Sequence, residues 1–160
     1  MRASSCLWVV LLLAVPGCSD PVDLTRGLQI LDVSSGWRDA GPVSGGQNKL
    51  VPSVTFRIKN VSGQQLAILQ VNALFRRVNE GEEWGSGFMT VAGSQGLAPG
   101  ASSQILTINS QLGYTGREPE HQMLQNSQFV DAKVQVFAKY GSVQWVRVSE
   151  FGITRRLIGR

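Results

Sequence analysis

The chain has 160 residues, a formal net charge of +4 and 18 glycines among many Val, Ile and Leu residues. A single domain of this length can bury about two thirds of its surface. The basic residues are scattered rather than clustered, which argues against nucleic-acid binding, and the composition is typical of strands and turns, not of a disordered chain.

The first 17 residues have the pattern of an export leader. Arg2 precedes an apolar run at residues 7–15, which is far shorter than the roughly 20 residues that a membrane-spanning helix needs. A basic start, a short apolar segment and a small-residue junction are typical of a secretory signal peptide. An ordinary cleaved signal peptide with an incidental Cys18 is the simpler alternative.

The junction Val15-Pro16-Gly17-Cys18 resembles the lipobox of bacterial lipoproteins. The resemblance implies cleavage before Cys18, acylation of Cys18 and a periplasm-facing lipid anchor. Ser19 follows the cysteine in place of an aspartate, which favours the outer membrane over the inner membrane. Several acyl chains anchor a protein stably where one chain does not. We therefore expect a leader over 1–17, an acylated cysteine with a polar tether over 18–27, and a domain over 28–160.

The domain is predicted to consist of short strands. Period-two alternation of apolar and polar residues indicates half-buried strands, and glycine-rich segments indicate turns or loops. We predict strands at 28–33, 54–59, 69–76, 84–91, 104–108, 130–139 and 143–151, a Gly-rich loop at 34–49, and one helix at 118–126 within a long connection over 109–128.

About seven strands with one short helix predict an all-β, immunoglobulin-like antiparallel β-sandwich. The apolar phase of the three clearest strands predicts the core. These residues are Val54, Phe56, Ile58, Leu69, Val71, Phe75, Val134 and Val136.

Residues 54–108 also resemble bacterial FxLYD-type and related Ig-like modules. The matching pieces are FRIKNVSG, VNALFRRVNEGEEW and LAPGASSQ, which follow that family's order of strand, Asn-x-Ser turn, aromatic-ending strand, acidic turn and LxPG turn. The family's Leu-Tyr-Asp piece is absent. Such modules mostly have no assigned activity, so the resemblance concerns the fold.

Residues able to support catalysis are few. His121 is the one histidine, and Glu80, Glu82 and Glu83 fall in a predicted hairpin turn. A nucleophilic serine needs a base close by, and catalytic zinc needs three protein ligands. His121-Gln122-Met123 resembles the H-x-M fragment of periplasmic copper chaperones, without the further His and Met ligands of that family. We therefore expect no catalytic residue, no metal and no cofactor.

The aromatic residues offer the best candidates for binding. Trp37 in the Gly-rich loop, Tyr114 between Gly113 and Gly116, and nearby His121 are the predicted contact residues, because aromatic rings dominate interface hot spots. Trp84 or Trp145 is the expected core tryptophan. Tyr114 either exposes its ring or folds back to cap the core.

Our hypothesis from the sequence is a lipid-anchored, non-catalytic, periplasmic binding or accessory module of a bacterial envelope complex, with a protein partner and no nucleic acid. The alternative is a lipoprotein that binds a small ligand or glycan through loop aromatics. A hydrolase is a distant third.

Overall fold

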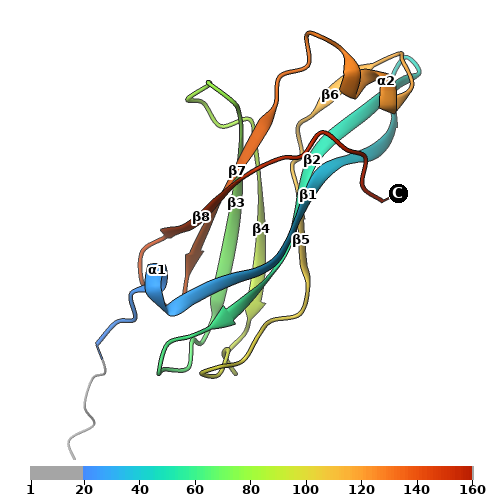
Figure 1. Cartoon of the computed structure of the whole chain (residues 1–160). Coiled ribbons are helices and arrows are strands. Elements are labelled where there is room, and N and C mark those ends of the chain that lie inside the picture. The colour runs from blue at the N-terminus through green and yellow to red at the C-terminus, as the bar shows by residue number, and fades with distance from the viewer. Residues whose placement is uncertain (1–19, 160) are drawn as a thin grey trace, which may run out of the picture.

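The computed structural model describes residues 20–159, which form two antiparallel sheets packed face to face (Figure 1). The fold is an all-β sandwich, as predicted. Its elements are α1 (Leu24–Gly27), β1 (Leu28–Val43), β2 (Gln47–Asn60), β3 (Leu69–Arg77), β4 (Gly85–Ala92), β5 (Leu106–Asn109), β6 (Tyr114–Gly116), α2 (Glu120–Gln125), β7 (Ala132–Lys139) and β8 (Val146–Gly152).

The strand order is that of an immunoglobulin-like sandwich. One sheet has the order β1-β2-β5, with β6 also pairing with β2, and the other has the order β4-β3-β7-β8. Immunoglobulin domains place their strands A, B and E in one sheet and C, F and G in the other, with C′ added beside C. Strands A, B and E correspond to β1, β2 and β5. Strands C, F, G and C′ correspond to β3, β7, β8 and β4.

The core lies between the sheets and follows the period-two pattern. All eight predicted core residues have a relative exposure of 0%. Their polar neighbours in sequence, such as Arg57, Gln70 and Gln135, are only partly buried and point to the outer faces. Alternate side chains of a strand point to opposite faces of the sheet, so the alternation in the sequence identified the inner face correctly.

The Gly-rich segment at 34–49 is not a loop, and this prediction was wrong. β1 and β2 form one long hairpin, paired from Leu28↔Asn60 to Val43↔Gln47. The tight turn uses Gly45 and Gly46 at φ +80° and +69°, a region that suits glycine. The ladder shifts register between Leu31 and Ser34 and again between Asp39 and Pro42, and these bulges interrupt the alternation that would have marked a strand.

The C-terminal segment after β8 closes one side of the sandwich. The backbone N–H of Trp37 donates to the carbonyl of Arg156 at 2.8 Å, and the N–H of Ile158 donates to the carbonyl of Trp37 at 2.9 Å. These bonds add residues 156–158 in parallel to the outer edge of β1. Gly36 lies beneath them, since a Cβ there would be 2.9 Å from the Arg156 carbonyl oxygen.

The packed domain begins before residue 28. Leu24, on α1, is only 1% exposed and belongs to the core, so the tether predicted over 18–27 is in part folded structure. The N–H of Val22 donates to the Tyr140 hydroxyl at 2.5 Å, which ties the segment before α1 to the residue that follows β7. Cys18, the predicted acylation site, lies outside the described residues.

The long connection between β5 and β7 carries the predicted helix and an unpredicted strand. α2 covers residues 120–125 of the expected 118–126, and Pro119 occupies its N-cap position. β6 is a three-residue strand that pairs with the start of β2. Within residues 20–159, no helix is long and apolar enough to cross a membrane.

Candidate functional site

The candidate site lies at the α2 end of the sandwich. The connection over residues 110–131 folds β6 and α2 against the β1–β2 hairpin there (Figure 1). The described chain begins beside α1, at the opposite end (Figure 1). The predicted contact region therefore lies far from the N-terminal segment.

Four aromatic side chains, which we call the aromatic cluster, gather beneath β6 and α2. They are Trp37, Trp84, Tyr114 and Phe129. The Trp37 ring centroid lies 4.6 Å from that of Phe129, 5.7 Å from that of Tyr114 and 6.0 Å from that of Trp84. Tyr114 lies a further 5.0 Å from Trp84 and 4.6 Å from Phe129. Tilted and edge-on pairs at such distances are the favoured aromatic geometries.

Trp37 is the buried centre of the aromatic cluster, not an exposed contact residue. Its relative exposure is 0%, and its Nε1 has no hydrogen-bond partner among the described residues. Trp84 is half-buried and Trp145 is 38% exposed. The surface position expected for Trp37 was therefore wrong, because the hairpin carries Trp37 into the core. Of the two tryptophans expected in the core, Trp84 packs against it and Trp145 lies at the surface.

Tyr114 folds back over the core, which is the second of the two alternatives. Its hydroxyl donates to the carbonyl of Val130 at 3.1 Å, and its ring is partly buried against Trp37. Gly113 permits this position, because a Cβ there would collide with the carbonyl of Leu50. The remaining exposed part of the ring faces a cleft.

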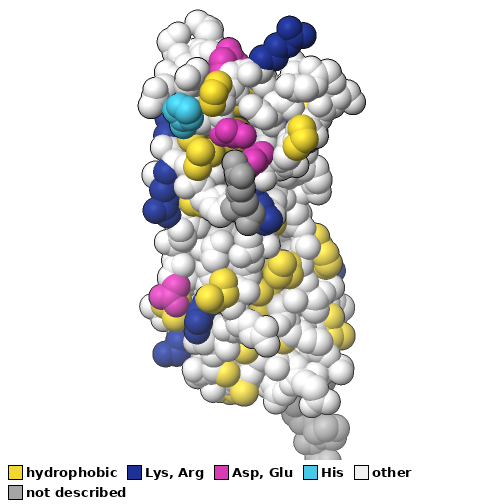
Figure 2. Space-filling view, turned by 90° about the vertical axis from the view of Figure 1, so that its right-hand side faces the viewer, with side chains coloured by type: hydrophobic (Ala, Val, Ile, Leu, Met, Phe, Trp, Pro, Cys, Tyr) yellow, Lys and Arg dark blue, Asp and Glu magenta, His cyan; other side chains and the backbone are white. Residues whose placement is uncertain are grey.

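His121 is exposed on α2, as expected of a surface residue, but it does not join the aromatic cluster. It borders an open depression of about 540 Å³ together with Leu124, Gln125, Arg155 and Leu157. Figure 2 shows its imidazole at the surface near hydrophobic and acidic side chains. Within the described residues, no group of three or more His, Cys, Asp or Glu residues could hold a metal ion.

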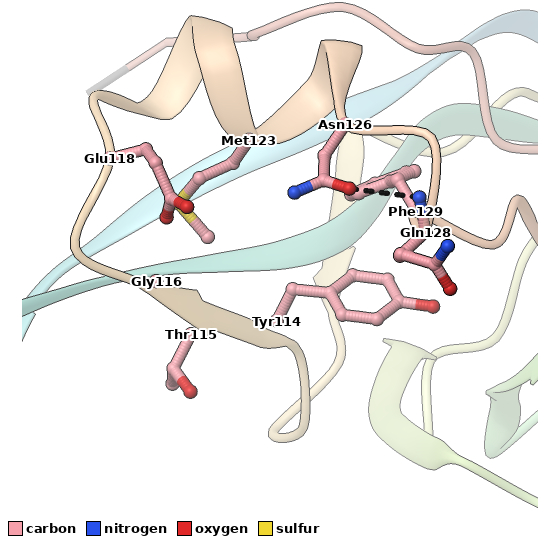
Figure 3. A pocket seen from close by; sticks show the side chains of 8 residues that line it. All are labelled: Tyr114, Thr115, Gly116, Glu118, Met123, Asn126, Gln128 and Phe129. Carbon is pink, nitrogen blue, oxygen red and sulfur yellow. Dashed lines mark hydrogen bonds between the residues drawn. The ribbon is translucent and has the colours of Figure 1, made fainter.

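A small cleft, which we call the α2 cleft, opens between β6 and α2 (Figure 3). Its volume is about 110 Å³. The residues that shape it include Tyr114, Gly116, Glu118, Met123, Asn126 and Phe129. In Figure 3 the Glu118 carboxylate points toward the Met123 thioether, and the Asn126 amide extends toward the open space beside them. Asn126 Oδ1 accepts a hydrogen bond of 2.8 Å from the N–H of Gln128.

Arg155 braces this end of the molecule. Its guanidinium bonds to Asp131 Oδ1 at 2.5 Å and to the carbonyl of Phe129 at 2.9 Å, and it lies 5.1 Å from the centre of the Phe129 ring. The hydrogen bond to Asp131 raises the pKa of Arg155 further above its ordinary value. Arg155 therefore holds the long connection against the C-terminal segment.

Sequence reasoning missed two residues of the site. Phe129 and Arg155 shape or brace the α2 cleft, yet no local pattern distinguishes them. Met123 was named only in the fragment that resembles the copper chaperones, and the structure buries it beside the cleft. Phe129 directly precedes the predicted strand at 130–139, and its aromatic character was the one available signal. The three glutamates Glu80, Glu82 and Glu83 are exposed in the turn before β4, as predicted.

No model of a known protein family matches the chain, and no curated protein is similar to it in sequence. Solved structures with a similar backbone include a structural genomics target, SoR45, with a TM-score of 0.44 and 14% identity, covering 81% of this chain and 88% of that chain. The putative ApaA protein from Bordetella pertussis has a TM-score of 0.44 and 17% identity, covering 80% and 93%. The ligand binding region of serine-glutamate repeat protein A of Enterococcus faecium has a TM-score of 0.30 and 12% identity, covering 74% and 89%. These similarities assign no activity to this chain.

Proposed function

We propose that this chain is a lipid-anchored, non-catalytic binding module of the bacterial envelope, which contacts a protein partner through its α2 end. The lipobox-like junction at residues 15–18 supports the anchor, with Cys18 as the acylated residue and the outer membrane as its site. The domain then faces the periplasm, and the partner is another protein of the envelope.

One observation carries the proposal. The α2 cleft and the aromatic cluster lie at the end of the sandwich opposite α1, where the described chain begins (Figure 1). An anchor that precedes α1 leaves the α2 end free to meet a partner away from the lipid surface.

The size of the α2 cleft suits one side chain of a protein partner better than a whole small ligand or glycan. Sites for drug-sized molecules usually have volumes of about 300 to 1,000 Å³, and the α2 cleft has about 110 Å³. A cleft of that volume suits one side chain of a larger surface. Interfaces are commonly organised around one such anchor residue in a pocket.

The contact is tested by filling the cleft. In Asn126→Arg, an arginine replaces an exposed amide that extends over the cleft, so we expect it to occupy the space itself and to abolish cross-linking to the partner in intact cells. Gln95→Arg, at an exposed turn residue outside the cleft, is the matched control and should cross-link as wild type does. Equal cross-linking by all three proteins would refute a contact at the α2 end.

The anchor is tested separately at Cys18. Metabolic labelling with a palmitate analogue should label the wild type and not Cys18→Ser, which lacks the thiol that is acylated. The variant should also leave the membrane fraction. Equal membrane retention of both proteins, without label in either, would exclude the lipid anchor.

A further inference from the structure

We infer that the α2 cleft receives a lysine or arginine side chain from the partner protein. This inference rests on the proposed function for the existence of a protein partner, and it adds the chemistry of the residue that is bound. Three features of the cleft support it: its apolar walls, its unpaired carboxylate and the affinity of the aromatic cluster for cations.

The walls of the cleft suit the stem of a long side chain. Met123 is 6% exposed, and its thioether lines the cleft opposite the ring of Tyr114 (Figure 3). Lysine and arginine pack their methylene stems along apolar surface and keep the charged group at the polar rim. Gly116 lets the Glu118 carboxylate and the Met123 thioether pack close to the backbone of β6, because a Cβ there would lie 2.7 Å from Glu118 Oε2 and 3.2 Å from the Met123 methyl group.

The rim carries a negative charge without a partner. Glu118 is exposed, and it makes no ion pair with any residue in 20–159. No lysine or arginine lines the cleft. Lys49 pairs in register with Thr115, on the face of β6 opposite Tyr114 and Gly116, and its ammonium donates to the carbonyl of Gln111. A cation from a partner would therefore meet the Glu118 carboxylate without competition from Lys49.

Two rings of the aromatic cluster already hold cations of this chain. The Arg155 guanidinium lies 5.1 Å from the centre of the Phe129 ring, and the Arg77 guanidinium lies 5.5 Å from that of Trp84. Cations within about 6 Å of an aromatic ring are attracted to its face. Tyr114, whose ring lines the cleft, has no such cation among the described residues. A cation of the partner at the cleft would supply the Tyr114 ring with such a contact.

The inference can be tested with three blocked tripeptides, each with a central lysine, norleucine or glutamate between glycines. Norleucine has an apolar stem but no ammonium group. The full chain, purified in detergent and labelled with ¹³C at its methionine methyl groups, reports binding by NMR. The Met123 methyl lies in the cleft, and Met89 on β4 is an internal reference because it does not line the cleft.

We expect the lysine peptide to shift the Met123 signal saturably and to leave Met89 unchanged. Its affinity should exceed that of the norleucine peptide about two- to fivefold, the effect of a solvent-exposed ion pair, and the glutamate peptide should bind most weakly. Glu118→Gln should remove the preference for lysine over norleucine. Asp20→Asn, which removes one exposed carboxylate outside the cleft, should retain it.

Equal or tighter binding of the norleucine peptide, or a Met123 signal that responds to none of the peptides, would overturn the inference. Loss of the lysine preference in Asp20→Asn as well would also overturn it, because the effect would then reflect net charge. Cross-linking that is lost in Asn126→Arg without a lysine preference would leave the proposed function intact and refute only the cationic side chain.

Discussion

Replacing Trp37 with alanine should destabilise the domain by about 3 to 5 kcal/mol. Trp37 is fully buried and contacts three other rings. A buried aromatic side chain removes about 150 to 250 Å² from water, which at about 25 cal/mol per Å² corresponds to about 4 to 6 kcal/mol. Partial collapse around the site brings the loss into the range of about 3 to 5 kcal/mol found for such truncations.

Urea denaturation followed by far-UV circular dichroism measures this loss. With a denaturant slope of about 2 kcal/mol per M, a loss of 4 kcal/mol lowers the midpoint by about 2 M. A domain with a total stability of about 5 kcal/mol would scarcely remain folded after that loss. A milder substitution at the same position therefore completes the test.

Trp37→Phe keeps a ring in the core and removes the Nε1 donor, which has no hydrogen-bond partner among the described residues. A buried donor without a partner costs about 1 to 3 kcal/mol, so its removal offsets much of the lost ring volume. We expect Trp37→Phe to change stability by less than about 1.5 kcal/mol. A loss below about 1 kcal/mol in Trp37→Ala, or equal losses in both variants, would refute the placement of Trp37 in the core.

Three further predictions concern other parts of the fold. Phe75→Ala should cost about 3 to 5 kcal/mol in the same urea assay, because its ring is fully buried between the sheets, and a loss below about 1 kcal/mol would mean that the ring lies outside the core. The hydrogen bond from Gln135 lowers the pKa of Glu150. The folded pKa is thus below the unfolded value of about 4.3, so this stabilisation is present above that pH and is lost as the pH falls through the folded pKa. The Glu150 side chain is 40% exposed, so its contribution to the free energy of unfolding should be below about 1 kcal/mol. In acid denaturation, the free energy of unfolding of Gln135→Ala should fall less steeply with decreasing pH than that of the wild type. An unchanged pH dependence would contradict this role of the hydrogen bond. Gly113→Ala should shift the NMR signals of Tyr114, since a Cβ would force β6 away from β2; unchanged signals would show that the backbone tolerates the methyl group.

The sandwich could be predicted because its inner strands are regular. Val54, Phe56 and Ile58 alternate without interruption with polar residues, so that the period alone identifies the buried face. β1 could not be predicted beyond residue 33, because two bulges break its period and glycines surround Trp37. The local sequence pattern therefore failed to predict β1, which is an irregular strand. β1 is stabilised by pairing with β2 on one edge and with residues 156–158 on the other.

The candidate site was less predictable than the fold. Trp37, Trp84, Tyr114 and Phe129 lie far apart in the chain. The β1–β2 hairpin, the turn before β4 and the long connection bring them together. Local sequence context directed attention to Trp37 and Tyr114, which contact each other, although the exposed position expected for Trp37 was wrong. It could not show that one ring fills the core while the other borders a cleft, because burial depends on neighbours that are remote in sequence.

The parallel pairing of residues 156–158 with Trp37 has a kinetic consequence. The contacts between Trp37 and residues 156–158 can form only after the chain between them has closed into a very large loop. Folding is slower when contacts are less local. The outer edge of β1 at Trp37 therefore stays open until the last residues of the domain are available. An open strand edge is a template for pairing with other chains. A domain that starts at residue 20 and is cut before Arg156 should consequently associate with itself during refolding, whereas the domain over residues 20–159 should close that edge and remain monodisperse in analytical ultracentrifugation.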